Sequence, residues 1–543
     1  MSIRKELSGK KILITGASGF LGKTLLEKLL WEVPDVSEVR LLVRPGKESS
    51  DRHESARLRI INDIQTSPAF KRLRERETDL IQFLDKRIRV IPCDFLQEDL
   101  GLSKEDQNTI LNGLDAVIHI AATVSWDERF DYSIRANSLG TNKLLKMVQS
   151  CSPVPRFVHI SSAYVHGQRT GRVLETAFDP EKSIANELGS KESFQIESEI
   201  QQALDRADQV EKESKSADQI RKFEQEIFLR SGVTADSGGN GIADQVENLR
   251  RKYVRSILSD YGIERARRHG WIDSYTFSKA MAEMLLIKNR GAVPLAIIRP
   301  PGITSALRDP ETGWLEGYHL TEPLIEGLGR GLIKVFPGLP ESVIDTVPVD
   351  CVVNLILAVT ASLKDASKPH VYQIATSDLN PITLGEIERT WRNYFNRNPL
   401  NDSKGRPVTV HPAKLVADPV RFVKGLRQRY GIPLSIAENL LHRLSWAKTI
   451  GSYRKLLGWV LRSRKRLERM TRFSDLYSTY TINSWCFVSD NTQKLLSELS
   501  GEDLERFNFD VKQINWTEFW SEIHIPGMRR YVLKNDTSAE AAA

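Results

Sequence analysis

The sequence predicts an α/β fold in which a doubly wound parallel sheet carries a helical insertion and is followed by a mainly helical C-terminal domain. Two observations lead to this prediction. Before residue 370, short aliphatic runs alternate with helical patterns, which is typical of β–α–β units. The runs are continuous, as in strands that helices cover on both faces. Beyond residue 370 helical periodicity dominates, so we place the domains at 1–370 and 371–543.

The predicted elements follow one another in the order that such a sheet requires. The first strand, KILIT at 11–15, precedes a helix at 20–33. Five further strands are predicted at 38–44, 87–94, 115–122, 156–162 and 294–300. Residues 181–270 break the rhythm with charged helical sequence, which we interpret as a helical insertion. The insertion is either a solvated helical pair or a lid or partner surface.

Composition indicates a soluble, cytoplasmic protein of at least two domains. The 543 residues are 40% apolar and 27% charged. No signal-peptide pattern is present, and the longest apolar run, at 351–363, is too short and too polar for a transmembrane helix. The four cysteines, Cys93, Cys151, Cys351 and Cys486, lie far apart and form no metal-binding pattern, so we expect a reducing compartment and no metal site.

One segment carries the whole basic excess of the chain. Residues 421–472 hold 14 Lys/Arg against two acids, Glu438 and Glu468, within a total net charge of +7. Such a segment favours an anionic partner, either a phosphate-bearing substrate or a membrane surface, on which the protein would then lie peripherally. An ordinary basic surface helix is the third interpretation. No motif supports nucleic-acid binding.

A glycine-rich turn follows the first predicted strand. TGASGFLG at 15–22 has the GxxGxxG spacing between a strand and a helix, which is typical of dinucleotide binding. A tight turn, a close approach to pyrophosphate and close helix packing each require one of the glycines. The alternative is a plain strand–helix turn. The predicted cofactor-binding residues here are Thr15, Gly16, Ser18, Gly19, Phe20, Leu21 and Gly22.

Residues after the next strands refine the cofactor prediction. An acid at the end of the second strand would accept a ribose hydroxyl, but the chain has Arg44 and Lys47, which favour the 2′-phosphate of NADPH. Asp94 is either an adenine ligand or a helix N-cap. Ala121 and Ala122 either leave room for the cofactor or simply pack.

The segment SYTFSKAMAE at 274–283 places a phenol and an amine one helical turn apart. Tyr275 and Lys279 share a helix face. An ammonium lowers the pKa of a nearby phenol, so we expect Tyr275 to act as acid or base, and Lys279 also to bind the ribose hydroxyls. Ser161 or Ser162, after the fifth strand, would hold the substrate carbonyl. Asn137 would anchor Lys279 through water.

These motifs together resemble the extended short-chain dehydrogenase/reductase superfamily, whose sheet is Rossmann-like. The similarity covers TGASGFLG, NSLGT, SSAYVHG, YTFSK and RPPGI, in the same order. It implies Ser162, Tyr275 and Lys279 as catalytic residues, and it places Pro301 and Gly302 beside the nicotinamide. Ser162 and Tyr275 are 113 residues apart, and the insertion accounts for this unusual distance.

Flanking segments look like alcohol-forming fatty acyl-CoA reductases. The resemblance rests on AATVSWDERFDYSIRANSLGTNKLL, RPPGITSALRDPETGW, FVSDNTQKLLSEL and FNFDVKQINWTEFW. It implies that NADPH reduces a long-chain fatty acyl-CoA to a fatty aldehyde, releasing CoA, and then to a fatty alcohol, a wax precursor. The alternatives are a reductase that stops at the aldehyde, a sugar or sterol dehydrogenase, and a cofactor-binding scaffold without catalysis.

Overall fold

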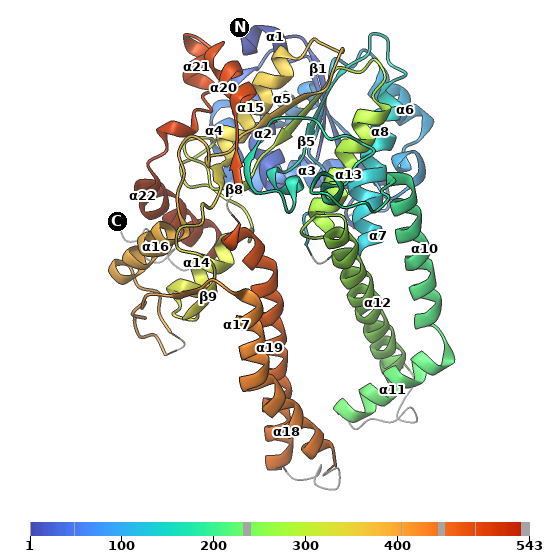
Figure 1. The fold of residues 1–543 in the computed structure, drawn as a ribbon. Coiled ribbons are helices and arrows are strands. Elements are labelled where there is room, and N and C mark those ends of the chain that lie inside the picture. Colours follow the sequence, from blue (N-terminus) through green and yellow to red (C-terminus); the bar gives the residue numbers. More distant parts are fainter. Residues whose placement is uncertain are drawn as a thin grey trace. The chain divides into compact units, whose positions relative to one another are not determined.

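A computed structural model describes residues 2–47, 49–126, 128–231, 240–402, 404–443, 451–483 and 485–533 (Figure 1). They form two compact units. Unit 1 comprises Met1–Glu316, Val347–Ala375 and Phe487–Gln513, and unit 2 comprises Gly317–Thr346, Thr376–Cys486 and Ile514–Ala543. Each unit is built from three separate stretches of the chain, so no single boundary divides them. The expected domain boundary near residue 370 stays a prediction.

Unit 1 is built on a seven-stranded parallel sheet, which confirms the predicted doubly wound fold. The strand order is β11-β7-β5-β4-β1-β2-β3. The strands are β1 Lys11–Thr15, β2 Glu38–Val43, β3 Ile88–Pro92, β4 Ala116–His119, β5 Arg156–Ile160, β7 Leu295–Arg299 and β11 His370–Gln373. The sequence predicted six of them and missed β11. The order reverses between β1 and β4, and ligands bind at such a reversal in open α/β sheets.

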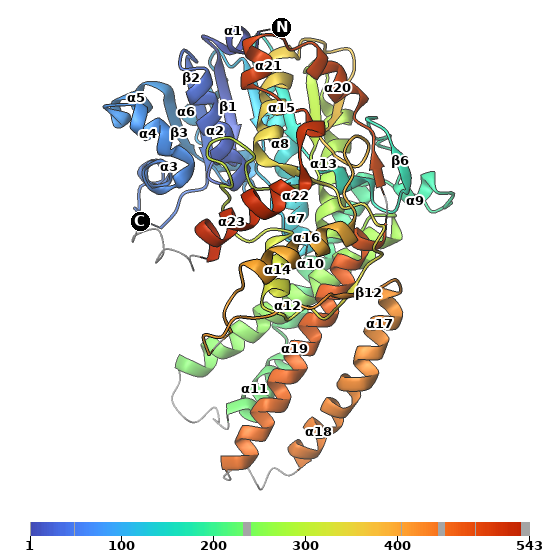
Figure 2. The ribbon, with the colours of Figure 1, turned by 90° about the vertical axis from the view of Figure 1, so that its left-hand side faces the viewer.

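Helices cover both faces of this sheet. The helices α1 (Ile3–Leu7), α2 (Phe20–Glu32) and α15 (Val349–Ser362) pack together on one face (Figure 2). The helices α6 (Lys104–Leu111), α8 (Gly140–Val148) and α13 (Ser274–Asn289) share a buried cluster with the other face.

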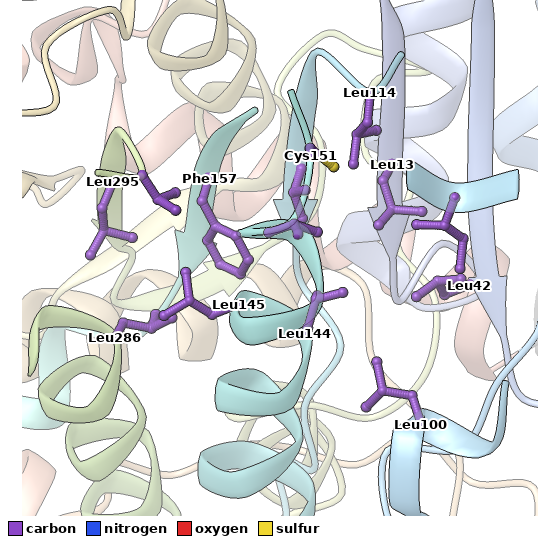
Figure 3. Close-up of a cluster of buried hydrophobic side chains, with 14 of the residues drawn as sticks. Leu13, Leu42, Leu100, Leu114, Leu144, Leu145, Cys151, Phe157, Leu286 and Leu295 are labelled. Atoms are coloured by element: carbon purple, nitrogen blue, oxygen red, sulfur yellow. The ribbon is translucent and has the colours of Figure 1, made fainter. Parts of the chain in front are cut away.

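In that cluster, Leu13 and Phe157 of the strands meet Leu144 and Leu145 of α8 and Leu286 of α13 (Figure 3). Burying a side chain of this size stabilises a fold by about 1.5–3 kcal/mol. The cluster therefore fixes α13, the helix that carries Tyr275, against the sheet.

The segment 181–270 is helical, and one end of it packs against helix α13 of the core. It contains α9 (Ile184–Glu187), α10 (Ile196–Ser214), α11 (Ala217–Ser231) and α12 (Asn240–Arg268). Away from the sheet, α10 and α12 lie side by side around a small apolar cluster of Ala207, Val210, Val254 and Leu258 (Figure 1). At their base, Ile196, Ile200 and Ala266 join a larger cluster with Phe277 and Met284 of α13.

Further elements complete unit 1. They are α3 Arg52–Thr66, α4 Lys71–Arg76, α5 Leu80–Arg87, α7 Phe130–Ser133, β6 Gly171–Val173, β8 Gly302–Thr304, α20 Asp490–Ser497 and α21 Glu502–Arg506. The segment 487–513 is bonded into the unit. Lys28 Nζ donates to the Arg506 carbonyl at 2.7 Å, and Gln373 Nε2 donates to the Val488 carbonyl at 2.8 Å.

Unit 2 is mainly helical. It contains α14 Glu322–Gly329, α16 Leu384–Arg397, α17 Pro419–Leu426, α18 Ile432–Arg443, α19 Gly451–Ile482, α22 Trp516–Glu518, α23 Ile525–Met528 and the paired strands β9 Val335–Pro337 and β12 Lys414–Val416. Trp391 and Phe395 of α16 are buried, as is Trp520, whose ring packs edge-on against Trp391.

Candidate active site

The turn between β1 and α2 lies where the strand order reverses. Gly16 has φ +76°, and a Cβ built on it would lie 2.8 Å from the backbone nitrogen of Ala121, just beyond β4. A Cβ on Gly22 would lie 2.1 Å from the Gly16 carbonyl oxygen. Thr15 Oγ1 accepts the N–H groups of Ile120 and Ala121 at 3.2 and 3.0 Å. Close packing of the chain on itself therefore requires glycine at 16 and 22.

Gly19 has no such packing reason. It is the N-cap of α2, no side chain caps that helix, and an added Cβ would meet only the Gly16 carbonyl oxygen, at 3.5 Å. The missing side chain leaves the first amides of α2 open to an anion, as a pyrophosphate site requires. Ser18 and Phe20 are half-buried beside this turn, whereas Leu21 is buried in the core. The residues present therefore fit a dinucleotide.

Three cations gather after β2. Arg44 and Lys47 are exposed, and Arg44 donates to the Tyr132 hydroxyl at 3.4 Å. Arg59 of α3 donates to the Arg44 carbonyl at 3.0 Å, which brings a third positive charge to the same place. Sequence reasoning missed Arg59, because only the packing of α3 against the sheet brings this helix position to the end of β2.

The residues after β3 and β4 bear on two of the alternatives, while their contacts with a cofactor stay predictions. Asp94 Oδ1 accepts the Leu96 N–H at 3.0 Å, so Asp94 caps a turn, and the helix N-cap interpretation is wrong. The helical turn that follows begins at Glu98. Ala122 is exposed, so packing does not explain its small side chain, whereas the backbone of Ala121 lies against Gly16.

The structure brings Ser162 to Tyr275 across the intervening insertion. Ser162 follows β5 and caps the 3-10 turn Ala163–His166, where its Oγ accepts the Tyr164 N–H at 3.2 Å. The same side chain is close enough to Tyr275, in the first turn of α13, to act on the pKa of its phenol. The Ser161 hydroxyl is buried and has no hydrogen-bond partner among the described residues. Ser162, rather than Ser161, is thus the serine next to the phenol.

Lys279 lies on the same helix but is bonded elsewhere. Its Nζ donates to the Ile160 carbonyl at 2.5 Å and lies 3.3 Å from His159 Nε2. Burial lowers the pKa of Lys279 to about 7. Burial also raises the pKa of Tyr275 to about 12, and the neighbouring Ser162 hydroxyl opposes the shift. Lys279 therefore does not lower the pKa of the phenol in this structure, and the expectation that it would is wrong. The phenol stays protonated.

Asn137 lies in a π-helical segment, Ile134–Leu139, between α7 and α8. Its Oδ1 accepts the Thr123 N–H at 2.8 Å, and its Nδ2 donates to Ser278 Oγ at 3.0 Å. Asn137 therefore joins the segment after β4 to the residue before Lys279. Its water-mediated contact with Lys279 stays a prediction.

Two buried histidines behind the site were missed by the sequence reasoning. His119 of β4 and His159 of β5 are register partners, and their rings stack with centroids 5.4 Å apart. His119 bonds to Thr15 and Thr141 at 2.7 and 2.8 Å, and burial lowers its pKa to about 3. The signal was a histidine at the equivalent place in two neighbouring strands, DAVIHIAA and RFVHISS.

Pro301 and Gly302 follow β7 at the same edge of the sheet and are buried. The Ser161 N–H donates to the Ile298 carbonyl at 2.7 Å, and the Ala163 N–H donates to the Pro300 carbonyl at 2.8 Å. The segment after β7 is thereby tied to the segment that carries Ser162.

Comparisons with known families and proteins agree over nearly the whole chain. An NAD-binding family model described as male sterility protein matches residues 14–356, and the Sterile model, with the same description, matches residues 444–535. The chain is 31% identical to fatty acyl-CoA reductase 2, chloroplastic, of Arabidopsis thaliana, over 98% of this chain and 80% of that protein. It is 29% identical to the alcohol-forming fatty acyl-CoA reductase of Simmondsia chinensis, over 98% and 99%.

Among solved structures, the fold is similar to the terminal R domain from the myxalamid PKS-NRPS biosynthetic pathway. The TM-score is 0.51 at 16% identity, over 96% of this chain and 91% of that one. At this identity the likeness concerns the fold alone.

Proposed function

We propose that this chain, which belongs to the fatty acyl-CoA reductase family, reduces a long-chain fatty acyl-CoA to the fatty alcohol by way of the aldehyde, releasing coenzyme A. The observation that carries the proposal is the extent of the similarity. It covers the region after residue 370 as well as the NAD-binding region, and the Simmondsia chinensis relative is itself named as alcohol-forming.

The cofactor is a nicotinamide dinucleotide, and we assign it as NADPH. The turn at Gly16, Gly19 and Gly22 would hold the pyrophosphate. Arg44, with Arg59 at its carbonyl, would pair with a 2′-phosphate, and guanidinium groups suit that partner. When bound, the nicotinamide supplies the hydride for each of the two reductions.

Ser162, Tyr275 and Lys279 would carry the rest of the chemistry. The substrate carbonyl oxygen gains negative charge during reduction, and hydroxyl donors at Ser162 and Tyr275 stabilise it. With its pKa raised to about 12, Tyr275 holds a proton at Oη that it can donate to this oxygen. The amine of Lys279, with a pKa of about 7, can resupply a proton near neutral pH. The same groups would serve the thioester and the aldehyde.

The proposed partners are fatty acyl-CoA and fatty aldehyde as substrates, with peripheral membrane contact through residues 421–472. Among the residues that the structure describes, no helix is both long and apolar enough to cross a membrane. A cytoplasmic location, with a reducing environment, accords with the wide separation of the four cysteines along the sequence.

The test is the ratio of NADPH consumed to fatty alcohol formed from palmitoyl-CoA, with products identified by gas chromatography. Two NADPH per alcohol, with little free aldehyde, is the expected result. One NADPH per aldehyde would assign the chain to the aldehyde-forming alternative. NADH offered at equal concentration tests the cofactor assignment in the same assay.

A further inference from the structure

The basic segment forms a helical hairpin with two distinct faces. The run α17–α18 continues through a π-helical segment, Arg427–Gly431, and packs against α19 (Figures 1 and 2). Its inner face is closed: Leu441, Tyr453 and Val460 are buried together, and the Tyr453 hydroxyl donates to the Leu441 carbonyl at 2.8 Å. The hairpin therefore already has a core of its own.

A second apolar stripe lies on the outside of α18. Ile432, Ile436 and Leu440 follow at intervals of four residues, so they share one helix face. On α19, Leu456 and Trp459 are likewise exposed. All five side chains are between 50% and 57% exposed. Scattered exposed apolar residues need no explanation, but a stripe of branched residues opposite a closed core indicates a surface that is covered in use.

The charges on α19 divide between the same two faces. Arg464 pairs with Glu438 across the contact between α19 and α18. Lys455, Arg462 and Arg466 lie four residues before, three after and seven after Trp459, so they share the outward face with it, and all three are exposed. Cations next to exposed Trp and Leu side chains are typical of helices that lie in the headgroup region of an anionic bilayer.

We propose that the hairpin α17–α19 docks on an anionic lipid bilayer, with the α18 stripe and Trp459 entering the headgroup layer and the outward cations meeting lipid phosphates. Only the purpose of this docking rests on the proposed function: a bilayer accumulates the long-chain acyl substrates and alcohol products. A hairpin with its own closed core can present this surface without unfolding.

The experiment measures cosedimentation of the full-length protein with phosphatidylcholine vesicles that contain either no phosphatidylserine or about a third of it. The wild type is expected to bind the anionic vesicles and to be released by salt, because screening weakens surface attraction. Replacing the stripe by Ile432→Ser, Ile436→Ser and Leu440→Ser should weaken binding at least about tenfold, since each loses buried methylene groups. Its matched control, Leu174→Ser with Leu188→Ser, removes exposed apolar area elsewhere and should bind as the wild type does.

A second variant, Lys455→Gln, Arg462→Gln and Arg466→Gln, tests the charges. It should lower binding to anionic vesicles by about two orders of magnitude, at about fivefold for each cation, and reduce the salt dependence. The charge-matched control is Lys191→Gln, Lys215→Gln and Lys222→Gln, three exposed lysines of unit 1. Quenching of Trp459 by brominated lipid, lost in Trp459→Phe, would support insertion.

Four results would overturn the proposal. The wild type could fail to bind anionic vesicles, or both hairpin variants could bind like the wild type. The stripe variant could instead dissociate a dimer, which would assign the stripe to a second copy of the chain. The cation variant could raise the KM for acyl-CoA without changing vesicle binding, which would assign the charges to CoA phosphates. Vesicle binding is scored without turnover, so its failure is distinguishable from failure of the proposed activity.

Discussion

Replacing Lys279 by methionine should stabilise the cofactor-free protein while abolishing its activity. The side chain is 2% exposed, and burial lowers its pKa from 10.5 to about 7. Between these two pH values the unfolded chain carries a proton on this amine that the folded chain has lost. Stability therefore rises with pH across that window, and below it the folded state bears the full cost of the buried charge.

The size of the effect follows from the same shift. A difference of one pKa unit corresponds to about 1.4 kcal/mol, so the lowered pKa costs about 4 kcal/mol at pH 7. Methionine fills a similar volume without charge, but it leaves the Ile160 carbonyl without its donor, a loss of about 1 kcal/mol. Lys279→Met should thus gain about 3 kcal/mol at pH 7, and the gain should shrink by about 1.4 kcal/mol per pH unit above that.

The assay is urea-induced unfolding of the cofactor-free protein, followed by tryptophan fluorescence at pH 7 and pH 9. Lys288→Met is the control on the same helix, because Lys288 is partly exposed and bonded to Glu197, which raises its pKa rather than lowering it. The control should show no gain at pH 7. If Lys279→Met is no more stable than the wild type at pH 7, or if its gain does not shrink with pH, the lowered pKa is refuted.

Three further predictions concern the site. Tyr275→Phe should lower kcat about 10²–10⁴-fold while NADPH still quenches protein fluorescence, because only the proton donor is lost. Arg44→Ala and Arg59→Ala should each raise the KM for NADPH about tenfold and leave the KM for NADH unchanged, since each loses a charge-assisted contact with the 2′-phosphate. Gly19→Ala should keep its Tm and lose cofactor binding, measured by calorimetry, whereas Gly22→Ala should lower the Tm because its Cβ would meet the backbone at 2.1 Å.

Each of these has a control or a contrary result. For the arginines the control is Arg57→Ala, which removes an exposed arginine of α3 that pairs with Asp85 and should leave both KM values unchanged. Equal losses with NADPH and NADH would contradict the 2′-phosphate assignment. Turnover retained in Tyr275→Phe would move the proton donor elsewhere. Normal cofactor affinity in Gly19→Ala would show that nothing approaches that backbone closely.

The sequence predicted the fold where local pattern decides structure. Continuous aliphatic runs such as KILIT and LAIIR mark buried parallel strands, because few other elements tolerate them. The strand β11 reads HVYQ, four residues of mixed polarity, and only its pairing with β7 makes it a strand. The sequence pattern therefore did not predict a seventh strand near residue 370.

For the candidate site, the sequence named candidate residues but could not predict their environment. The glycine turn, Ser162 and Tyr275 could be named as candidates because their spacing and order are local features. Arg59 and His159 join them only through tertiary packing. The pKa of Lys279 depends on how much solvent the surrounding strands and helices exclude, and residue spacing carries no information about that.

The return of residues 487–513 to unit 1 has a consequence for how the chain is made. During translation the glycine turn is made first and β11 about 350 residues later. Lys28 on α2 bonds to the carbonyl of Arg506, and Gln373 on β11 bonds to that of Val488, so both bonds form only after those later residues are made. Until those residues emerge, Lys28 has, among the described residues, only its carboxylate partners Glu32 and Asp309, and Gln373 Nε2 has only the Val173 carbonyl, so each lacks one of its bonds. Unit 1 therefore gains its last segment only after most of unit 2 has been translated, and we expect a chain stopped before residue 487 to leave the β11 edge open to chaperones and proteases.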